Sequence, residues 1–288
     1  MKRGLGVNGS SMNSKRLSQV RSRSLLPNQT KGQVTVFIIA AILIVGLAMV
    51  VYFLRPGITS TTEFDEKNPT GFIQTCMEEE ITNAVSLVSL QGGSTNPEHF
   101  ILSESNKIEY LCYMTEDCRP CVVQRALLKQ HIESEIKEEI ESSVASCFEK
   151  LVASYESGGY TTNLEHGPNA TKVELLPKRV VTSFNYTLTA TKANTKRYDS
   201  FNVVLNNNLY ELVSIANSII DSESNLGDAN ERFYMDIYPD LKVEKFNQND
   251  GSTIYIVTDR NREGNSFQFA SRSVALPAGY ACNNVATN

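Results

Sequence analysis

Cys118 and Cys121, separated by two residues, have the types and spacing that most directly suggest chemistry. A C-x-x-C motif that follows a strand and opens a helix is typical of redox-active dithiols, because the helix N-terminus lowers the pKa of the first thiol. Cys112, Cys118, Cys121 and His131 would also supply the four ligands of a zinc site. No βαβ pattern precedes the motif, however, and Cys112 is a nearby alternative partner. A structural disulfide is therefore favoured over both chemistries.

All six cysteines lie in the part of the chain after residue 54: Cys76, Cys112, Cys118, Cys121, Cys147 and Cys282. An even number of cysteines on one side of the sequence predicts disulfides and an oxidising compartment. Cys76 and Cys147 lie on the apolar faces of two predicted helices, so packing of the helices would pair them. A hairpin would bring Cys112 opposite Cys121. Cys118 and Cys282 then either pair with each other or stay free.

The run Val34–Leu54 contains no charged residue and has the length of a helix that crosses a bilayer. Residues 1–33 hold seven Lys or Arg and no acidic residue, whereas the rest of the chain is net acidic. Because basic flanks stay in the cytoplasm, the N-terminus is predicted inside and the C-terminal part outside, with the plasma membrane as location. The lipid bilayer is thus a predicted partner, and the acidic exterior argues against nucleic acid.

Apolar periodicity predicts an α+β fold, with one N-terminal transmembrane helix followed by an extracytoplasmic domain of long helices packed with antiparallel strands. The predicted segments are a disordered cytoplasmic tail (1–33), the transmembrane helix (34–54), a linker (55–68), a helix–hairpin–helix part (69–157) and a strand-rich part (158–288). Helices are expected from residue 69 to Gly92, over about 124–154 and over about 208–224. Strands are expected in a hairpin over about 107–122 and near 172–176, 179–191, 198–205, 241–247, 252–258 and 266–274.

The sequence contains none of the common nucleotide-binding, hydrolase or metalloprotease motifs. His99, His131 and His166 lie about 30 residues apart and show no ligand spacing. The acidic run at 133–141 is interpreted as the solvated face of a helix. No catalytic residue, metal or cofactor is therefore predicted. Asn169 and Asn185 begin N-x-[ST] sequences, which makes both candidates for glycosylation, with Asn169 in an expected loop as the better one.

The segment that begins at Lys31, Gly32 and Gln33 and continues into the apolar run resembles the start of archaeal type IV pilin-like and archaellin precursors. This resemblance implies cleavage after Gly32, which would leave Gln33 as the new N-terminus. Pilins usually carry compact β-rich heads, whereas two long helical patterns follow here.

Over most of its length the chain is similar to uncharacterised single-pass surface proteins of small-genome archaea. The resemblance rests on the KGQVT-type start, on Phe72, Ile73 and Cys76, on the YLCY run at 110–113, and on the Cys147–Phe148 pair. It implies the architecture and the topology but no activity.

These observations favour a membrane-anchored, disulfide-stabilised cell-surface protein with a binding or structural role in the envelope. Its expected partners are other envelope proteins or further copies of the chain. One alternative is a pilin-like filament subunit processed after Gly32. The other is an extracytoplasmic thiol–disulfide oxidoreductase that uses Cys118 and Cys121.

Overall fold

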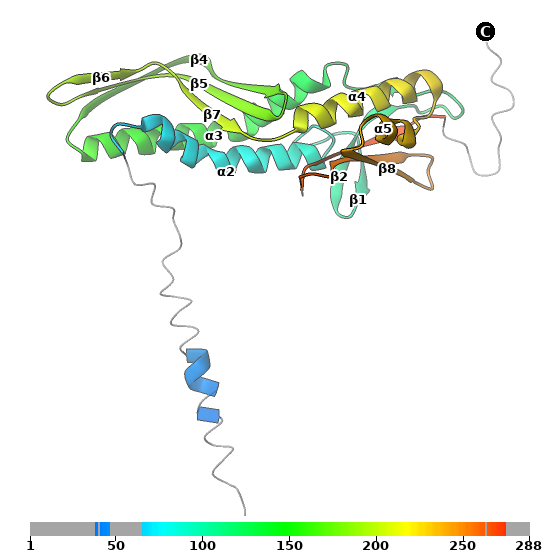
Figure 1. Cartoon of the computed structure of the whole chain (residues 1–288), viewed down its shortest axis with the longest axis horizontal. Helices are drawn as coiled ribbons and strands as arrows, with labels where there is room; N and C mark the ends of the chain where they lie inside the picture. Colours follow the sequence, from blue (N-terminus) through cyan, green and yellow to red (C-terminus); the bar gives the residue numbers. More distant parts are fainter. Residues whose placement is uncertain (1–37, 40, 47–64, 263, 275–288) are drawn as a thin grey trace, which may run out of the picture. The chain divides into compact units, whose positions relative to one another are not determined.

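The computed structural model describes residues 38–39, 41–46, 65–262 and 264–274 (Figure 1). The chain divides into two compact units, residues 1–61 and 62–288. In the first unit the described residues form short helical segments only. The described strands and the longer helices belong to the second unit.

The predicted transmembrane helix is the part of the fold class that the structure corrects. A helix needs about 20 consecutive apolar residues to cross the hydrocarbon core. No helix among the described residues is both long enough and apolar enough to do so. Within Val34–Leu54, the structure describes helix at 38–39 and 41–46, and the other residues of the run lie outside the described part.

The segments beside this run are described only in part. Residues 1–33, which include Gly32 and Gln33, lie outside the described residues, and the predicted linker 55–68 is described from residue 65 onward. A disordered tail and cleavage after Gly32 therefore stay predictions.

The second unit has an α+β fold. Its described helices are α2 (Pro69–Leu90), α3 (Leu128–Ser157), α4 (Leu209–Leu226) and α5 (Glu231–Ile237). Its larger sheet contains β1 (Phe100–Ser103), β2 (Asn106–Tyr113), β3 (Val122–Val123), β8 (Leu241–Asn247), β9 (Thr253–Asp259) and β10 (Ser266–Arg272). Its smaller sheet contains β4 (Thr161–Leu176), β5 (Arg179–Thr191), β6 (Thr195–Tyr198) and β7 (Phe201–Leu205).

The strand order of the larger sheet is β1-β2-β10-β9-β8. Strand β3 pairs with Cys112 and Tyr113 of β2, beyond the residues of β2 that pair with β1. Strands β2 and β10 are parallel, whereas the other described pairs in both sheets are antiparallel. Because β2 and β10 are neighbours, the parts predicted as 69–157 and 158–288 share one sheet. In the smaller sheet, β5 is central and pairs with β4, β6 and β7.

Helix α2 begins and ends where its local sequence directs. The side chain of Asn68 accepts a hydrogen bond from the Gly71 amide at 2.9 Å, and Pro69 occupies the first turn, where its missing N–H costs nothing. After α2 the chain turns at Gly92, whose φ is +80°. A Cβ at Gly92 would lie 2.9 Å from the Cβ of Glu109, so only glycine fits there.

The apolar stripe of α3 is buried along the whole helix, as its i+4 spacing predicts. It consists of Leu128, Ile132, Ile136, Ile140, Val144, Phe148, Leu151 and Tyr155. Helix α2 packs against α3 and β7, α3 also packs against β4, and α4 packs against β9 and β10 (Figure 1). The ring of Phe148 stacks on Tyr186, with centroids 4.1 Å apart, and thereby joins α3 to the smaller sheet.

Strands β1 and β6 and helix α5 were not predicted. Just before the hairpin predicted over about 107–122, the chain forms β1, which makes a hairpin with β2. The two turn residues, Glu104 and Ser105, have φ values of +49° and +73°, the geometry of a turn that usually contains Asn-Gly. Helix α5 has seven residues and begins after Asn230, whose side chain accepts from the Arg232 amide at 3.0 Å. Neither the turn nor the short helix has a strong composition signal.

The parallel alignment of β2 and β10 also differs from the expected antiparallel arrangement. The register sets Ala270 opposite Tyr110, which lies 160 residues away in the sequence. No turn connects strands that are so distant, so no local residue pattern reports their relative direction.

Candidate functional site

The disulfide between Cys76 and Cys147 confirms the first predicted pair. The two Cα atoms lie 6.1 Å apart, and the bond joins the first half of α2 to the second half of α3. At the other end of the helix pair, Gly93 lies against Leu128 and Ile132 of α3. The two helices are therefore antiparallel and are fixed to each other at both ends.

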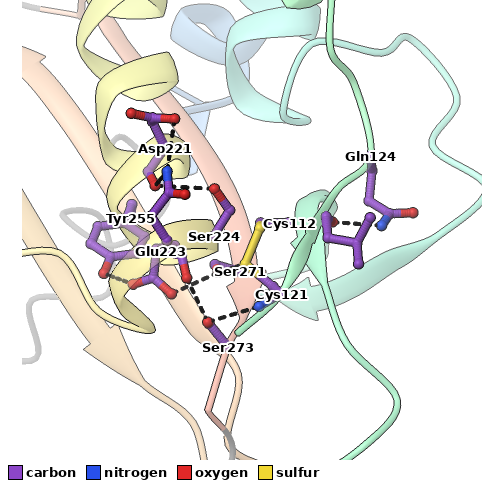
Figure 2. Close-up of a disulfide and its surroundings, with 11 residues drawn as sticks. Cys112, Cys121, Gln124, Asp221, Glu223, Ser224, Tyr255, Ser271 and Ser273 are labelled. Carbon is purple, nitrogen blue, oxygen red and sulfur yellow. Dashed lines mark hydrogen bonds between the residues drawn. A yellow bond between two sulfur atoms is a disulfide. The ribbon is translucent and has the colours of Figure 1, made fainter. Parts of the chain in front are cut away.

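The disulfide between Cys112 and Cys121 confirms the second predicted pair (Figure 2). The two Cα atoms lie 5.3 Å apart, and Cys112 is fully buried in β2 while Cys121 is 4% exposed. The register in which Cys112 is opposite Val123 makes β2 and β3 the hairpin that the pairing required. This bond ties the loop before β3 to the larger sheet.

Cys118 is also disulfide-bonded, and no described cysteine is free. Cys282 lies outside the described residues, so its pairing with Cys118 stays a prediction. Cys121 is bonded to Cys112, so the C-x-x-C motif is not a redox pair. Helix α3 begins seven residues after Cys121, so no helix N-terminus is placed to activate either thiol. The disfavoured zinc alternative fails as well, because two of its four ligands, Cys112 and Cys121, form one disulfide.

A buried carboxyl group lies beside this disulfide, and Figure 2 shows it between Tyr255 and Ser271. Glu223, in the last turn of α4, is 3% exposed. It accepts hydrogen bonds from the Tyr255 hydroxyl and, at 3.0 Å, from the Ser271 hydroxyl. Burial raises the pKa of Glu223, and the two hydrogen bonds offset only part of that increase. Burial and the neighbouring carboxyl group raise the pKa of Tyr255 as well.

Short polar contacts connect Glu223 to the disulfide. The Cys121 amide donates to the Ser273 hydroxyl at 3.0 Å, and that hydroxyl donates to the backbone oxygen of Glu223 at 2.8 Å. The Ser271 hydroxyl also lies 3.7 Å from the Cys121 sulfur. We call Cys112, Cys121, Glu223, Tyr255, Ser271 and Ser273 the disulfide junction. It holds a proton-accepting group where α4, β9, β10 and the β3 loop meet.

Replacing Glu223 with Gln is expected to change how stability depends on pH. Because its folded-state pKa is raised, Glu223 contributes stability below the unfolded-state pKa, and that contribution is lost as pH rises through the folded-state pKa. Gln stays neutral and avoids this loss. The unfolding free energy of Glu223→Gln relative to the unmodified chain should therefore rise by about 1.4 kcal/mol per pH unit within that window.

Urea unfolding at a series of pH values from mildly acidic to neutral measures this slope. The matched control is Glu139→Gln, because Glu139 is exposed on α3. Parallel pH profiles for Glu223→Gln and the unmodified chain would show that Glu223 carries no linked proton.

A second buried polar cluster lies between the loop after α2, β2 and the start of α3. Glu109 is 3% exposed, and its Oε1 accepts from Nε and Nη2 of Arg125 at 2.9 and 2.7 Å. Its Oε2 accepts from the Ser94 hydroxyl. The Ser94 oxygen lies 2.7 Å from Nε2 of His131. Because a hydroxyl has one hydrogen, which Ser94 gives to Glu109, Nε2 of His131 must be the donor in that contact.

The sequence contained a signal for this cluster that was not used. Glu109 is the one acidic residue in the strand-like run IEYLCYM. A charged residue within an apolar strand is rarely left without a partner. The acidic face of α3, which was interpreted as solvated, also makes contacts within the fold. Glu135 accepts hydrogen bonds from the amide and the hydroxyl of Thr95, both at 2.8 Å.

The remaining predicted residues lie apart from both clusters. His99 packs against the rings of Tyr110 and Tyr113. Asn169 is exposed and lies in β4 at a bulge, with φ of +58°, instead of in a loop. Asn185 is exposed in β5. Glycosylation at either asparagine stays a prediction.

Comparison with protein-family models, curated proteins and solved structures finds no match to this chain.

Proposed function

We propose that residues 62–288 form a disulfide-stabilised domain that works on the cell surface and has a binding or structural role there. The observation that carries this proposal is the state of the cysteines. Two disulfides join separate elements, and no described cysteine is free. Disulfides of this kind form and persist in oxidising compartments, whereas the cytoplasm keeps thiols reduced.

The burial of these cysteines supports a structural use of the sulfur atoms over thiol exchange. A catalytic disulfide must expose a sulfur atom to the attacking thiolate. Cys112 is fully buried, Cys121 and Cys147 are 4% and 3% exposed, and Cys76 is partly buried. Binding of another envelope molecule, or of a second copy of the chain, is the role that such a fixed domain serves.

Labelling of intact cells with a membrane-impermeant amine reagent tests the location. Lys172 and Lys242 have half or more of their side chains exposed, at 62% and 50%, and provide reactive amines on two different sheets. Both should be modified in intact cells to the same extent as after lysis. A cytoplasmic protein of the same cells serves as the control and should react only after lysis. Protection of both lysines until lysis would contradict a surface location.

A further inference from the structure

A cavity of about 620 Å³ opens in the second unit, away from the disulfide junction. Its walls come from the β4–β5 turn, the first turns of α4, the link from α5 to β8, and the turn after β9. Figure 1 shows α5 beside β8 in this region. The volume lies within the range of about 300–1,000 Å³ that is typical of small-ligand sites.

Two cationic side chains line this cavity and form no ion pair among the described residues, although Glu211, Asp240 and Asp259 lie in the same wall. Lys178 comes from the β4–β5 turn and Arg262 from the turn after β9. Neither forms an ion pair with any residue that the structure describes. Two such groups in one concave site attract an anionic group of a ligand.

One carboxylate in the wall is only half satisfied. Oε1 of Glu211 accepts from the Lys178 amide at 2.9 Å. Its Oε2 is buried and has no hydrogen-bond partner among the described residues. Asp259 differs, because its two oxygens accept from the Asn208 side chain at 2.7 Å and the Asn261 amide at 2.8 Å. A buried acceptor without a donor costs free energy, and an ammonium group of a ligand would remove that cost if the carboxylate turned this oxygen toward the cavity.

The wall also offers an apolar surface. Ile237 and Tyr238 are 51% and 47% exposed, although both line a concave site. Ile215 and Leu241, which are nearly buried, lie in the same wall. An apolar group of a ligand would cover these two exposed side chains, and the removal of their apolar surface from water would favour binding.

We propose that this cavity binds a short peptide with free termini. The ammonium group of the peptide is recognised by Glu211, its carboxylate by Lys178 and Arg262, and an apolar side chain packs on Ile237 and Tyr238. This inference rests on the proposed binding role and names the chemical class of the ligand. The peptide is zwitterionic because the cavity presents both an unsatisfied carboxylate oxygen and two cations that form no ion pair with a described residue.

Calorimetric titration of the purified full-length chain, with its disulfides intact, tests the proposal. The probes are three tripeptides with Leu at both ends and Leu, Tyr or Arg in the middle. Each is used with free termini, with an acetylated N-terminus and with an amidated C-terminus. At least one free peptide should bind at micromolar to millimolar concentration, and each modification should weaken its binding about tenfold, the worth of one charged hydrogen bond.

Two variants assign the ends of the peptide. In Glu211→Gln, acetylation of the peptide should no longer weaken binding, while amidation still does. In Arg262→Gln, the effect of amidation should be reduced and the effect of acetylation kept. Glu149→Gln and Arg260→Gln, which change residues outside the cavity wall, should discriminate as the unmodified chain does. Thermal unfolding of each variant checks that it is folded.

Failure of all three free peptides to bind at millimolar concentration would overturn the proposal. Equal binding of the acetylated and free forms would do so as well, because Glu211 would then recognise no ammonium group. Since these titrations use purified protein, either result leaves the surface location to be judged by the lysine labelling.

Discussion

A chain in which Cys76 and Cys147 are both replaced by Ala is expected to lose about 4 kcal/mol of its free energy of unfolding. The disulfide closes a loop across a sequence separation of 71 residues, so it removes much conformational freedom from the unfolded chain. It also fixes α2 to α3, whose facing stripes form a large part of the core. Urea unfolding with fluorescence or circular dichroism measures the difference.

The matched variant replaces Cys112 and Cys121 with Ala. That disulfide closes a separation of only 9 residues, and the same relation gives a loss of about 2.5 kcal/mol. Cys112, Cys121 and Cys147 are buried and Cys76 is partly buried, so the two variants differ mainly in the length of the loop that the disulfide closes. Equal losses, or a larger loss for the short loop, would contradict the role assigned to the Cys76–Cys147 bond.

Arg125→Met is expected to destabilise the fold by about 3 kcal/mol, because it leaves the Glu109 carboxylate buried without its cation. This is near the lower end for such pairs, since the Arg125 side chain is 38% exposed and water reaches part of the site. Met keeps most of the aliphatic volume of Arg, so the loss reports charge and hydrogen bonding more than packing. The measurement is again the free energy of unfolding.

Two controls make this result interpretable. The double variant Arg125→Met with Glu109→Gln should recover much of the loss, because no uncompensated charge is then buried. Arg119→Met breaks an exposed pair with Glu116 and should cost no more than about 1 kcal/mol. If Arg125→Met also costs less than about 1 kcal/mol, Glu109 does not depend on Arg125.

Much of the fold was predictable where one face of an element is buried. Helix α3 has apolar residues at i+4 spacing along its length, and β5 alternates between buried and less buried positions. Both were predicted from these periods. The turn at Glu104 and Ser105 was missed because its residues lack the usual preference for positive φ. The turn was an element that the sequence did not predict, whereas the run at 34–54 was predicted as an element that the structure does not show. Its apolar composition predicted a transmembrane helix, and no described helix is long and apolar enough to be one.

The candidate site was predictable only in its covalent part. The pairing of Cys76 with Cys147 follows from two apolar helix faces, and that of Cys112 with Cys121 from one hairpin. Glu223, in contrast, meets Ser271 across 48 residues, and Tyr255 across 32. Nothing near Glu223 in the sequence indicates that the last turn of α4 packs against β9 and β10. Such contacts depend on tertiary packing, which residue patterns do not encode locally.

Thiol trapping in the native cells tests the central claim most directly. Cells are quenched with acid, free thiols are alkylated, and peptides of the unreduced protein are identified by mass spectrometry. A disulfide-stabilised surface domain predicts linked peptides for Cys76 with Cys147 and for Cys112 with Cys121, with these four cysteines unalkylated. Alkylation of all four in protein taken directly from the cells would show that the domain works in a reducing compartment, and would contradict the account.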